Sequence, residues 1–183
     1  MEALYLDLLE SRLHQLWEEF LLRKGRLTEI RLEMELLVRR MREKDTKIPQ
    51  TTRGVITDFW IARLLGETGP LGDFNDIRKL YRYAGLNIRE RRSGTYVGQN
   101  RISKKGRSSL RKVLGQIVFP LVRRGNLYGE YYHRKKEYGM NGTKALVAVQ
   151  RKFLKMFYGW YKSERPFDME RVFNSQPERM SVA

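Results

Sequence analysis

Hydrophobic residues recur every three or four positions through the first part of the chain. They are Leu6, Leu9, Leu13, Leu16, Phe20, Leu27, Ile30, Met34, Leu37 and Met41. Arg23 occupies the remaining position of this series, so ten of eleven positions are apolar. Residues 4–45 contain no proline. A heptad repeat of this kind predicts a long helix that pairs with another helix as a coiled coil.

Two arrangements would bury this apolar seam. The helix could fold back around Gly25 into a hairpin that packs within one chain. The heptad phase is kept across the glycine, which favours one continuous helix and an intermolecular coiled coil. A continuous helix over residues 4–45 would be about 60 Å long at ~1.5 Å per residue. That length is too great for packing on a small domain alone.

The pattern changes after the first 45 residues. Asp45 to Arg53 is polar and contains Pro49, which predicts a linker or turn. Apolar residues then return at helical spacing in four segments, which predict helices at residues 54–65, 76–84, 107–121 and 144–162. We expect Pro120 to kink or end the third of these helices. Leu86 to Gly106 has no helical period, and we expect a loop or short β-hairpin around residues 88–103.

The expected fold is mainly α, with a long N-terminal coiled-coil helix followed by a compact basic helical domain. The expected boundaries are a coiled-coil arm at residues 1–46, the basic domain at residues 47–173 and a flexible tail at residues 174–183. No run of 18 apolar residues exists, so we predict no transmembrane helix. We expect a cytoplasmic protein associated with the nucleoid.

Charge divides the chain at the same place as the pattern. Residues 1–47 contain 10 acids and 10 bases, so residues 48–183 carry the whole net charge of +16. Between Arg78 and Arg124 there are 14 Lys or Arg and a single acid, Glu90. Such a density repels itself on a folded surface unless a polyanion neutralises it. We therefore expect the second part to bind nucleic acid, DNA above all; a solvated basic face is the alternative.

We expect twelve basic residues to contact nucleic acid. Nine lie in or beside the segment without helical period, and three lie on the last helix: Arg89, Arg91, Arg92, Arg101, Lys104, Lys105, Arg107, Arg111, Lys112, Lys144, Arg151 and Lys152. A cluster of tyrosines (Tyr128, Tyr131, Tyr132 and Tyr138) suits either base stacking or the core, and the core is favoured. His14 and His133 have no ligand partner one helical turn away, and the chain has no cysteine. We predict no metal site.

Ser93 is the serine for which a chemical role is considered. It precedes Gly94, and a Ser-Gly step allows a tight turn that exposes the hydroxyl. Arg91 and Arg92 come directly before it and could stabilise the charge on a phosphoryl transition state. By residue type alone, a loop serine is usually a turn former.

Several short motifs appear in a fixed order in the second part of the chain. They are Ala84-Gly85-Leu86, Ser93-Gly94, Arg101-Ile102-Ser103-Lys104-Lys105-Gly106, Leu110-Arg111 and Lys144-Ala145-Leu146-Val147. This order resembles that of the C-terminal transposase domain of insertion-sequence family one-ten. The members of that family are bridge-RNA-guided, DEDD-type transposases related to the pilin-gene invertases. The resemblance covers about residues 54–168. It departs from the family at residues 53–57, where the family usually has a Pro-Gly-x-Gly hairpin.

The resemblance implies a function. The serine of the Ser-Gly step is the family's nucleophile that joins covalently to DNA, and the matching residue is Ser93. The basic loop and following helix are then expected to contact DNA or a guide RNA, and the coiled coil to pair protomers as a homodimer or higher oligomer. The family's N-terminal RuvC-like domain, whose four acids hold magnesium, has no counterpart in this sequence. We therefore expect magnesium only with a RuvC-like partner domain, and DNA binding without cleavage by the chain alone.

Two hypotheses follow from the resemblance. The chain is either the catalytic C-terminal portion of a DNA transposase or a non-catalytic, dimeric nucleic-acid-binding protein derived from a transposase fragment. Only the first requires the hydroxyl of Ser93. Whether the chain is a fragment, a split reading frame or a decayed element stays open.

Overall fold

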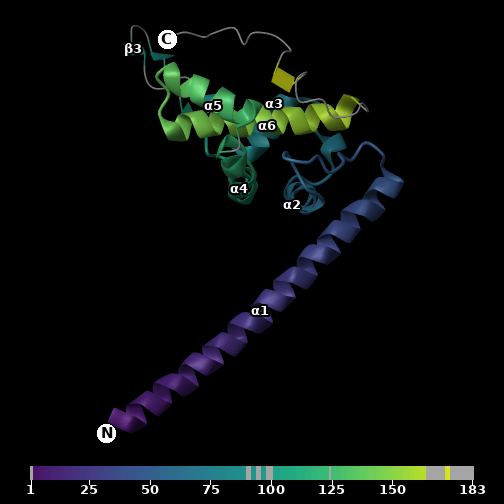
Figure 1. Cartoon of the computed structure of the whole chain (residues 1–183). Helices are drawn as coiled ribbons and strands as arrows, with labels where there is room; N and C mark the ends of the chain where they lie inside the picture. Colours follow the sequence, from purple (N-terminus) through teal and green to yellow (C-terminus); the bar gives the residue numbers. More distant parts are fainter. Residues whose placement is uncertain are drawn as a thin grey trace.

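The protein is mainly helical, as predicted, and a long arm projects from a globular part (Figure 1). The structure is a computed structural model that describes residues 2–89, 92–93, 96–97, 101–123, 125–163 and 172–173. For residues 2–4, 89, 92, 93, 96 and 97 only the backbone is described. Within these residues the elements are α1 (Glu2–Lys44), α2 (Asp58–Thr68), the 3₁₀ turn η1 (Leu71–Asp73), α3 (Ile77–Ala84), β1 (Ile88–Arg89), β2 (Arg92–Ser93), β3 (Tyr96–Val97), β4 (Arg101–Ile102), α4 (Ser108–Arg123), α5 (Leu127–Glu137) and α6 (Gly142–Ser163).

The arm is one uninterrupted helix. α1 continues through Gly25 without a break, so the alternative of a hairpin folded at that glycine is wrong. No atom lies within 4 Å of the place where a side chain on Gly25 would begin. Most of the apolar seam faces solvent, and Leu13 keeps 72% of its surface exposed. The coiled-coil partner that this seam predicts would have to come from outside the described chain.

Among the described residues, the C-terminal end of the arm is the part that is anchored to the globular part. Val38 is 1% exposed, and this end of α1 packs against α2. Asp58, at the start of α2, accepts hydrogen bonds from Arg42 and from the Thr51 hydroxyl at 2.6 Å. Arg39 adds a longer ion pair to the same carboxylate at 3.5 Å. Burial works against the charged form of Asp58, but these donors outweigh it and lower the pKa of the carboxyl.

The globular part is organised around α6. This helix packs against α3, α4 and α5, and α4 in turn contacts α2 and α5. Leu80, Leu114 and Phe153 are fully buried between these helices. In Figure 1, α5 and α6 run side by side, and α4 lies across from them toward the arm. The predicted compact helical domain is therefore present, with an apolar core of its own.

Several local predictions need correction. Pro120 does not end α4, which continues to Arg123. The segment from Leu127 to Glu137 is a helix, α5, that the apolar pattern did not predict. The sequence feature that marks its start is the cap residue Asn126, whose side chain accepts hydrogen bonds from the backbone N–H of two residues of the first turn. The predicted tail at residues 174–183 lies outside the described residues. In the part of the chain that is described, no helix has the length and apolarity needed to cross a membrane.

Candidate nucleic-acid interface

The candidate interface is a narrow β-ribbon between α3 and α4. Ile88 and Arg89 in β1 pair antiparallel with Ile102 and Arg101 in β4. Farther out, β2 pairs antiparallel with β3. Both pairs lie within the range for which a loop or short β-hairpin was predicted. We call the segment from residue 88 to residue 102 the ribbon.

Backbone hydrogen bonds continue the ribbon pairing into the globular part. The N–H of Ser103 donates to the carbonyl of Asn87 at 2.9 Å, and the Ser103 hydroxyl donates to the Asn87 side chain at 2.5 Å. The N–H of Lys104 donates to the carbonyl of Gly85 at 3.1 Å. The N–H of Arg107 donates to the carbonyl of Tyr83 at 2.8 Å. The two chains that carry the ribbon are thus joined where they enter the domain.

Two glycines let these chains approach closely. Gly85 ends α3 with φ 68°, and a side chain on it would begin 2.7 Å from a guanidinium nitrogen of Arg111. Gly106 has φ 152°, and its side chain would begin 2.5 Å from the carbonyl oxygen of Tyr83. Both φ values are ones that residues with a Cβ rarely adopt. The geometry at the base of the ribbon therefore requires glycine at both places.

Two of the residues predicted to contact nucleic acid hold the base of the ribbon. Arg111 donates to the carbonyls of Ala84 at 3.0 Å and Gly106 at 3.2 Å. Arg151 donates to the carbonyl of Leu86 at 2.5 Å, and its guanidinium lies 4.3 Å from the centre of the Tyr81 ring. These carbonyls cluster at the end of α3, where a helix carries partial negative charge. The two arginines position the ribbon from within the domain.

Arg107 is also partly neutralised. Its Nε donates to Glu67 at 2.7 Å, and the Ser109 hydroxyl donates to the same carboxylate oxygen at 2.5 Å. The hydrogen bonds from Ser109 and then Arg107 lower the pKa of Glu67. Arg107 also donates to the Tyr83 hydroxyl at 3.2 Å. The role of Glu67 could not be predicted from the sequence, because a single acid before a turn carries no pattern of its own.

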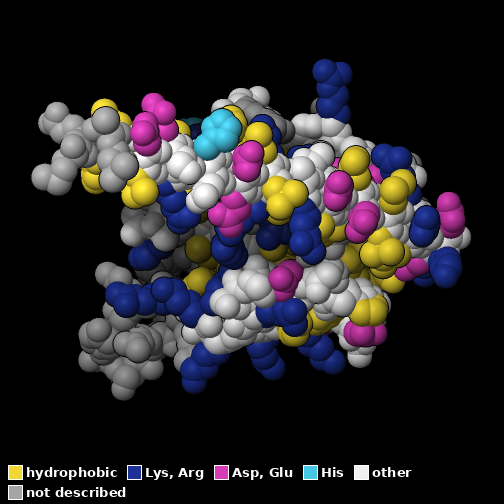
Figure 2. Space-filling view, turned by 90° about the horizontal axis from the view of Figure 1, so that it is seen from below, with side chains coloured by type: hydrophobic (Ala, Val, Ile, Leu, Met, Phe, Trp, Pro, Cys, Tyr) yellow, Lys and Arg dark blue, Asp and Glu magenta, His cyan; other side chains and the backbone are white. Residues whose placement is uncertain are grey.

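Four predicted contact residues have exposed side chains that form no ion pair or hydrogen bond within the described residues. They are Lys104, Lys105, Lys112 and Lys144. Arg101 is exposed too, but it has an interaction partner in the structure. The ammonium of Lys152 lies 5.8 Å from the Tyr131 ring centre and 5.2 Å from that of Phe173. In Figure 2, which views the molecule from below, Lys and Arg are more frequent than Asp and Glu on the visible face away from the arm.

Ser93 belongs to the ribbon strand β2. Its backbone pairs with Tyr96 in β3. The side chains of Ser93, Arg89 and Arg92 lie outside the described residues, as does the whole of Arg91. The proposed role of the Ser93 hydroxyl therefore stays a prediction.

The tyrosine cluster divides between the core and the surface. Tyr128 is fully buried, and burial raises the pKa of its hydroxyl. Tyr131 is also buried, at 9% exposure. Tyr138 keeps 67% of its surface exposed. The preference for the core is confirmed for the two buried residues.

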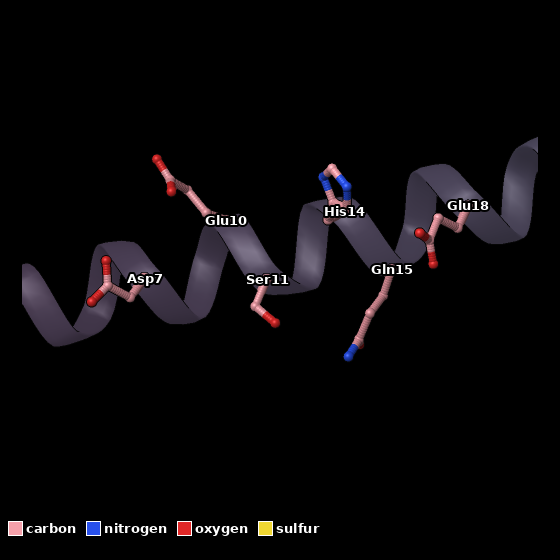
Figure 3. A pocket seen from close by; sticks show the side chains of 6 residues that line it. All are labelled: Asp7, Glu10, Ser11, His14, Gln15 and Glu18. Atoms are coloured by element: carbon pink, nitrogen blue, oxygen red, sulfur yellow. The ribbon is translucent and has the colours of Figure 1, made fainter.

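A second cluster of polar side chains lies on the arm, on one flank of α1 (Figure 3). Asp7, Glu10, His14 and Glu18 project from successive turns of this one helix, together with Ser11 and Gln15. In Figure 3 no other element closes over them, and the side chains do not converge. Among the described residues, no group of three or more His, Cys, Asp or Glu could hold a metal ion. The described side chains thus do not fit a magnesium site.

A family model described as Transposase IS116/IS110/IS902 family matches residues 52–133. The match begins before α2 and ends within α5, so it contains the ribbon and the residues that hold its base, except Arg151. It covers less than half of the chain and includes neither the arm nor α6. No curated protein matches the chain. The match supports a transposase-related role in DNA recombination.

Proposed function

We propose that this protein binds DNA through the ribbon and the lysines around it, as the DNA-handling part of a transposase. The observation that carries the proposal is the family match over residues 52–133, which contains the ribbon at its centre. The net charge of +16, confined to residues 48–183, supplies the attraction to phosphate. A guide RNA is a second polyanion that the same surface suits.

The catalytic part of the proposal concerns Ser93. Its hydroxyl would attack a DNA phosphorus, forming a serine–phosphate bond while the 3′ or 5′ oxygen of the broken strand leaves. A serine hydroxyl is a poor nucleophile at neutral pH without a base or metal to activate it. We assign that activation to a RuvC-like partner domain with its own acids and magnesium. Ser93 would supply the nucleophile, and the ribbon would present it.

A second candidate function is non-catalytic, dimeric DNA binding. It needs only the exposed lysines around the ribbon and the exposed seam of the arm, which the structure describes. In both functions the arm pairs two copies through its exposed seam. The two candidates share the basic surface and differ only in their need for the Ser93 hydroxyl.

The salt dependence of DNA binding tests the shared part. If about five phosphates are contacted, the logarithm of the affinity falls with the logarithm of salt at a slope of about −4.5. Lys104→Ala should reduce that slope by about one, without changing sequence preference. Lys44→Ala removes the same charge from the exposed end of α1, outside the predicted contact residues, and serves as the control. A response independent of salt would reject phosphate contact.

The ion pair between Arg107 and Glu67 provides a second test of phosphate contact. Arg107→Ala should weaken binding less than Lys104→Ala, because Glu67 already neutralises part of the arginine charge. Glu67→Gln should strengthen binding, since it frees the guanidinium. Equal losses from the two alanine variants, with no gain from Glu67→Gln, would show that the ion pair does not matter for binding.

A denaturing gel with labelled DNA tests the catalytic part. The chain alone should bind DNA and form no covalent adduct. Supplied with a RuvC-like domain, magnesium and a guide RNA, it should form a protein–DNA adduct that Ser93→Ala abolishes while binding stays intact. An adduct that survives Ser93→Ala would move the nucleophile to Ser103, Ser108 or Ser109. The absence of an adduct under every complementation would favour the non-catalytic function.

A further inference from the structure

Charged residues follow a regular order beside the apolar seam of the arm. With Leu6 and Leu13 at position a of successive heptads, positions e and g flank the seam. Position g holds Tyr5, Arg12, Glu19, Arg26, Glu33 and Arg40. Position e holds Ala3, Glu10, Trp17, Lys24, Arg31 and Val38. Because e and g residues of two helices face each other across a coiled coil, they decide the orientation of the pair.

We propose that two copies of the arm pair as an antiparallel coiled coil in which Leu13 of one copy packs against Ile30 of the other. This inference rests on the dimer proposed above and adds its orientation and register. The two-fold axis of the pair then crosses the seam at the level of Leu21 and Leu22, midway between Leu13 and Ile30. Figure 2 shows the apolar side chains of the arm exposed among acids and bases, open to such a partner.

The g flank is complementary in this register. In an antiparallel pair g faces g, because the two helices run in opposite directions. Arg12 of one copy then faces Glu33 of the other, and Glu19 faces Arg26. The sign of the charge alternates at successive g positions from Arg12 onward, so both contacts join opposite charges, and symmetry makes each of them twice.

The e flank is complementary too. Glu10 of one copy faces Arg31 of the other. Trp17 faces Lys24, which places an ammonium beside an aromatic ring, an attractive arrangement. Arg31 is held at the edge of the seam, where its guanidinium lies 4.9 Å from the centre of the Phe59 ring. No flank contact in this register brings two like charges together.

Arg23, the polar residue within the seam, also meets a suitable neighbour. In this register it faces Phe20 of the second copy, where a guanidinium can lie against the aromatic ring. Within its own helix Arg23 donates to Glu19 at 2.5 Å. The Phe20 ring stacks on Trp17 with 5.5 Å between the ring centres. The break in the seam thus falls beside the two-fold axis, with its charge compensated.

Other arrangements bring like charges together. In a parallel pair Arg23 would face Arg23 within the seam, and Arg26 would face Arg31 across the flank. An antiparallel pair shifted by one heptad in one direction places Arg26 opposite Arg26. A shift in the other direction places Glu19 opposite Glu19. Like-charge contacts of this kind disfavour all three alternatives.

The anchored end of the arm leaves most of the seam accessible, and Met34 alone among the ten apolar seam residues is half-buried. Val38 points into the globular part at 1% exposure, whereas its neighbour Leu37 is 57% exposed. Successive residues of a helix are turned by ~100°, so the seam lies beside the face that meets α2. A second copy can therefore cover the seam without displacing α2. The two basic domains would then sit at opposite ends of the paired arm, about 50 Å apart at ~1.5 Å per residue.

Disulfide cross-linking of the full chain tests orientation and register. The chain has no cysteine, so introduced cysteines are the only thiols. Leu13→Cys combined with Ile30→Cys should form a covalent dimer under mild oxidation, because Leu13 meets Ile30 only between antiparallel copies. Leu13→Cys alone should not cross-link, whereas a parallel pair would join it to itself. Strong cross-linking of the single variant would overturn the proposal, and so would a dimer in which neither variant cross-links.

Charge reversal provides an independent measurement. Glu33→Arg places like charges opposite Arg12 at two symmetric contacts, and should raise the dimer dissociation constant about tenfold. Adding Arg12→Glu to the same chain should restore the dimer, since the pair is then reversed. In a parallel pair these two residues do not meet, and the second change would give no rescue. A wild-type chain that sediments as a monomer would reject the dimer itself, without bearing on DNA binding.

Discussion

The arm and helix α6 have similar apolar patterns in sequence, but they differ in how much of the apolar face is buried in the structure. Both carry apolar residues at helical spacing. α6 buries Phe153 and Leu154 completely among helices of the same chain, whereas Leu13 in α1 is 72% exposed. Periodicity therefore indicates which face of a helix is to be covered, and says nothing about whether the covering surface comes from the same chain.

The largest expected effect comes from charging the seam of the arm. Leu13→Asp together with Leu37→Asp should convert dimers to monomers, because each change would bury an unpaired carboxylate in the coiled coil. Light scattering at tens of micromolar protein measures the outcome. The unfolding of the globular part should stay unchanged, since both leucines are exposed in the single chain. A wild-type chain that is already monomeric would remove the basis of this prediction.

Shortening one side chain in each region to alanine tests how differently the two regions contribute to the free energy of unfolding. Phe153→Ala should lower the free energy of unfolding by about 4 kcal/mol, because it opens a cavity in a closed core. Leu13→Ala should change the unfolding of dilute monomer by less than about 0.5 kcal/mol. Urea denaturation at low and high protein concentration compares them. Only the effect of Leu13→Ala should grow with concentration; equal effects of both variants in dilute solution would contradict the contrast.

The same glycine substitution should have opposite effects in the two regions. Gly106→Ala places a Cβ 2.5 Å from the carbonyl oxygen of Tyr83 at an unfavourable φ, and should destabilise by about 2–3 kcal/mol. Gly25→Ala meets no atom within 4 Å in the middle of α1, and should stabilise the helix by about 0.5–1 kcal/mol. Thermal unfolding followed by circular dichroism reports both changes. A Gly106→Ala variant as stable as the wild type would show that the base of the ribbon is not tightly packed.

The junction between the regions should be sensitive to pH. Asp58→Asn leaves Arg42 with a weaker acceptor, and should cost about 1–2 kcal/mol. The pKa of Asp58 is lowered in the folded protein, so its stabilising contribution is complete above the ordinary pKa of an aspartate. That contribution is lost as the pH falls through the lowered value. Urea midpoints measured between pH 7 and pH 3 should therefore decline more for the wild type than for Asp58→Asn.

Several features of the fold could be predicted from the sequence because they depend on local spacing. The heptads predicted the continuous arm, and the apolar stripe with Leu110 and Leu114 predicted α4. The lack of helical period between Leu86 and Gly106 predicted the region of the ribbon. α5 was missed, because its apolar residues are mixed with bases and its start depends on one cap, Asn126.

The candidate site shows the limit of that reasoning. The sequence determined that bases gather around the ribbon, since charge can be counted along a chain. It did not separate Arg111 and Arg151, which bind backbone carbonyls at the end of α3, from Lys104 and Lys105, which stay exposed. The difference depends on which carbonyl lies within hydrogen-bonding distance of each guanidinium after α3, α4 and α6 pack together. Such distances join residues far apart in the chain, so only the tertiary structure decides them.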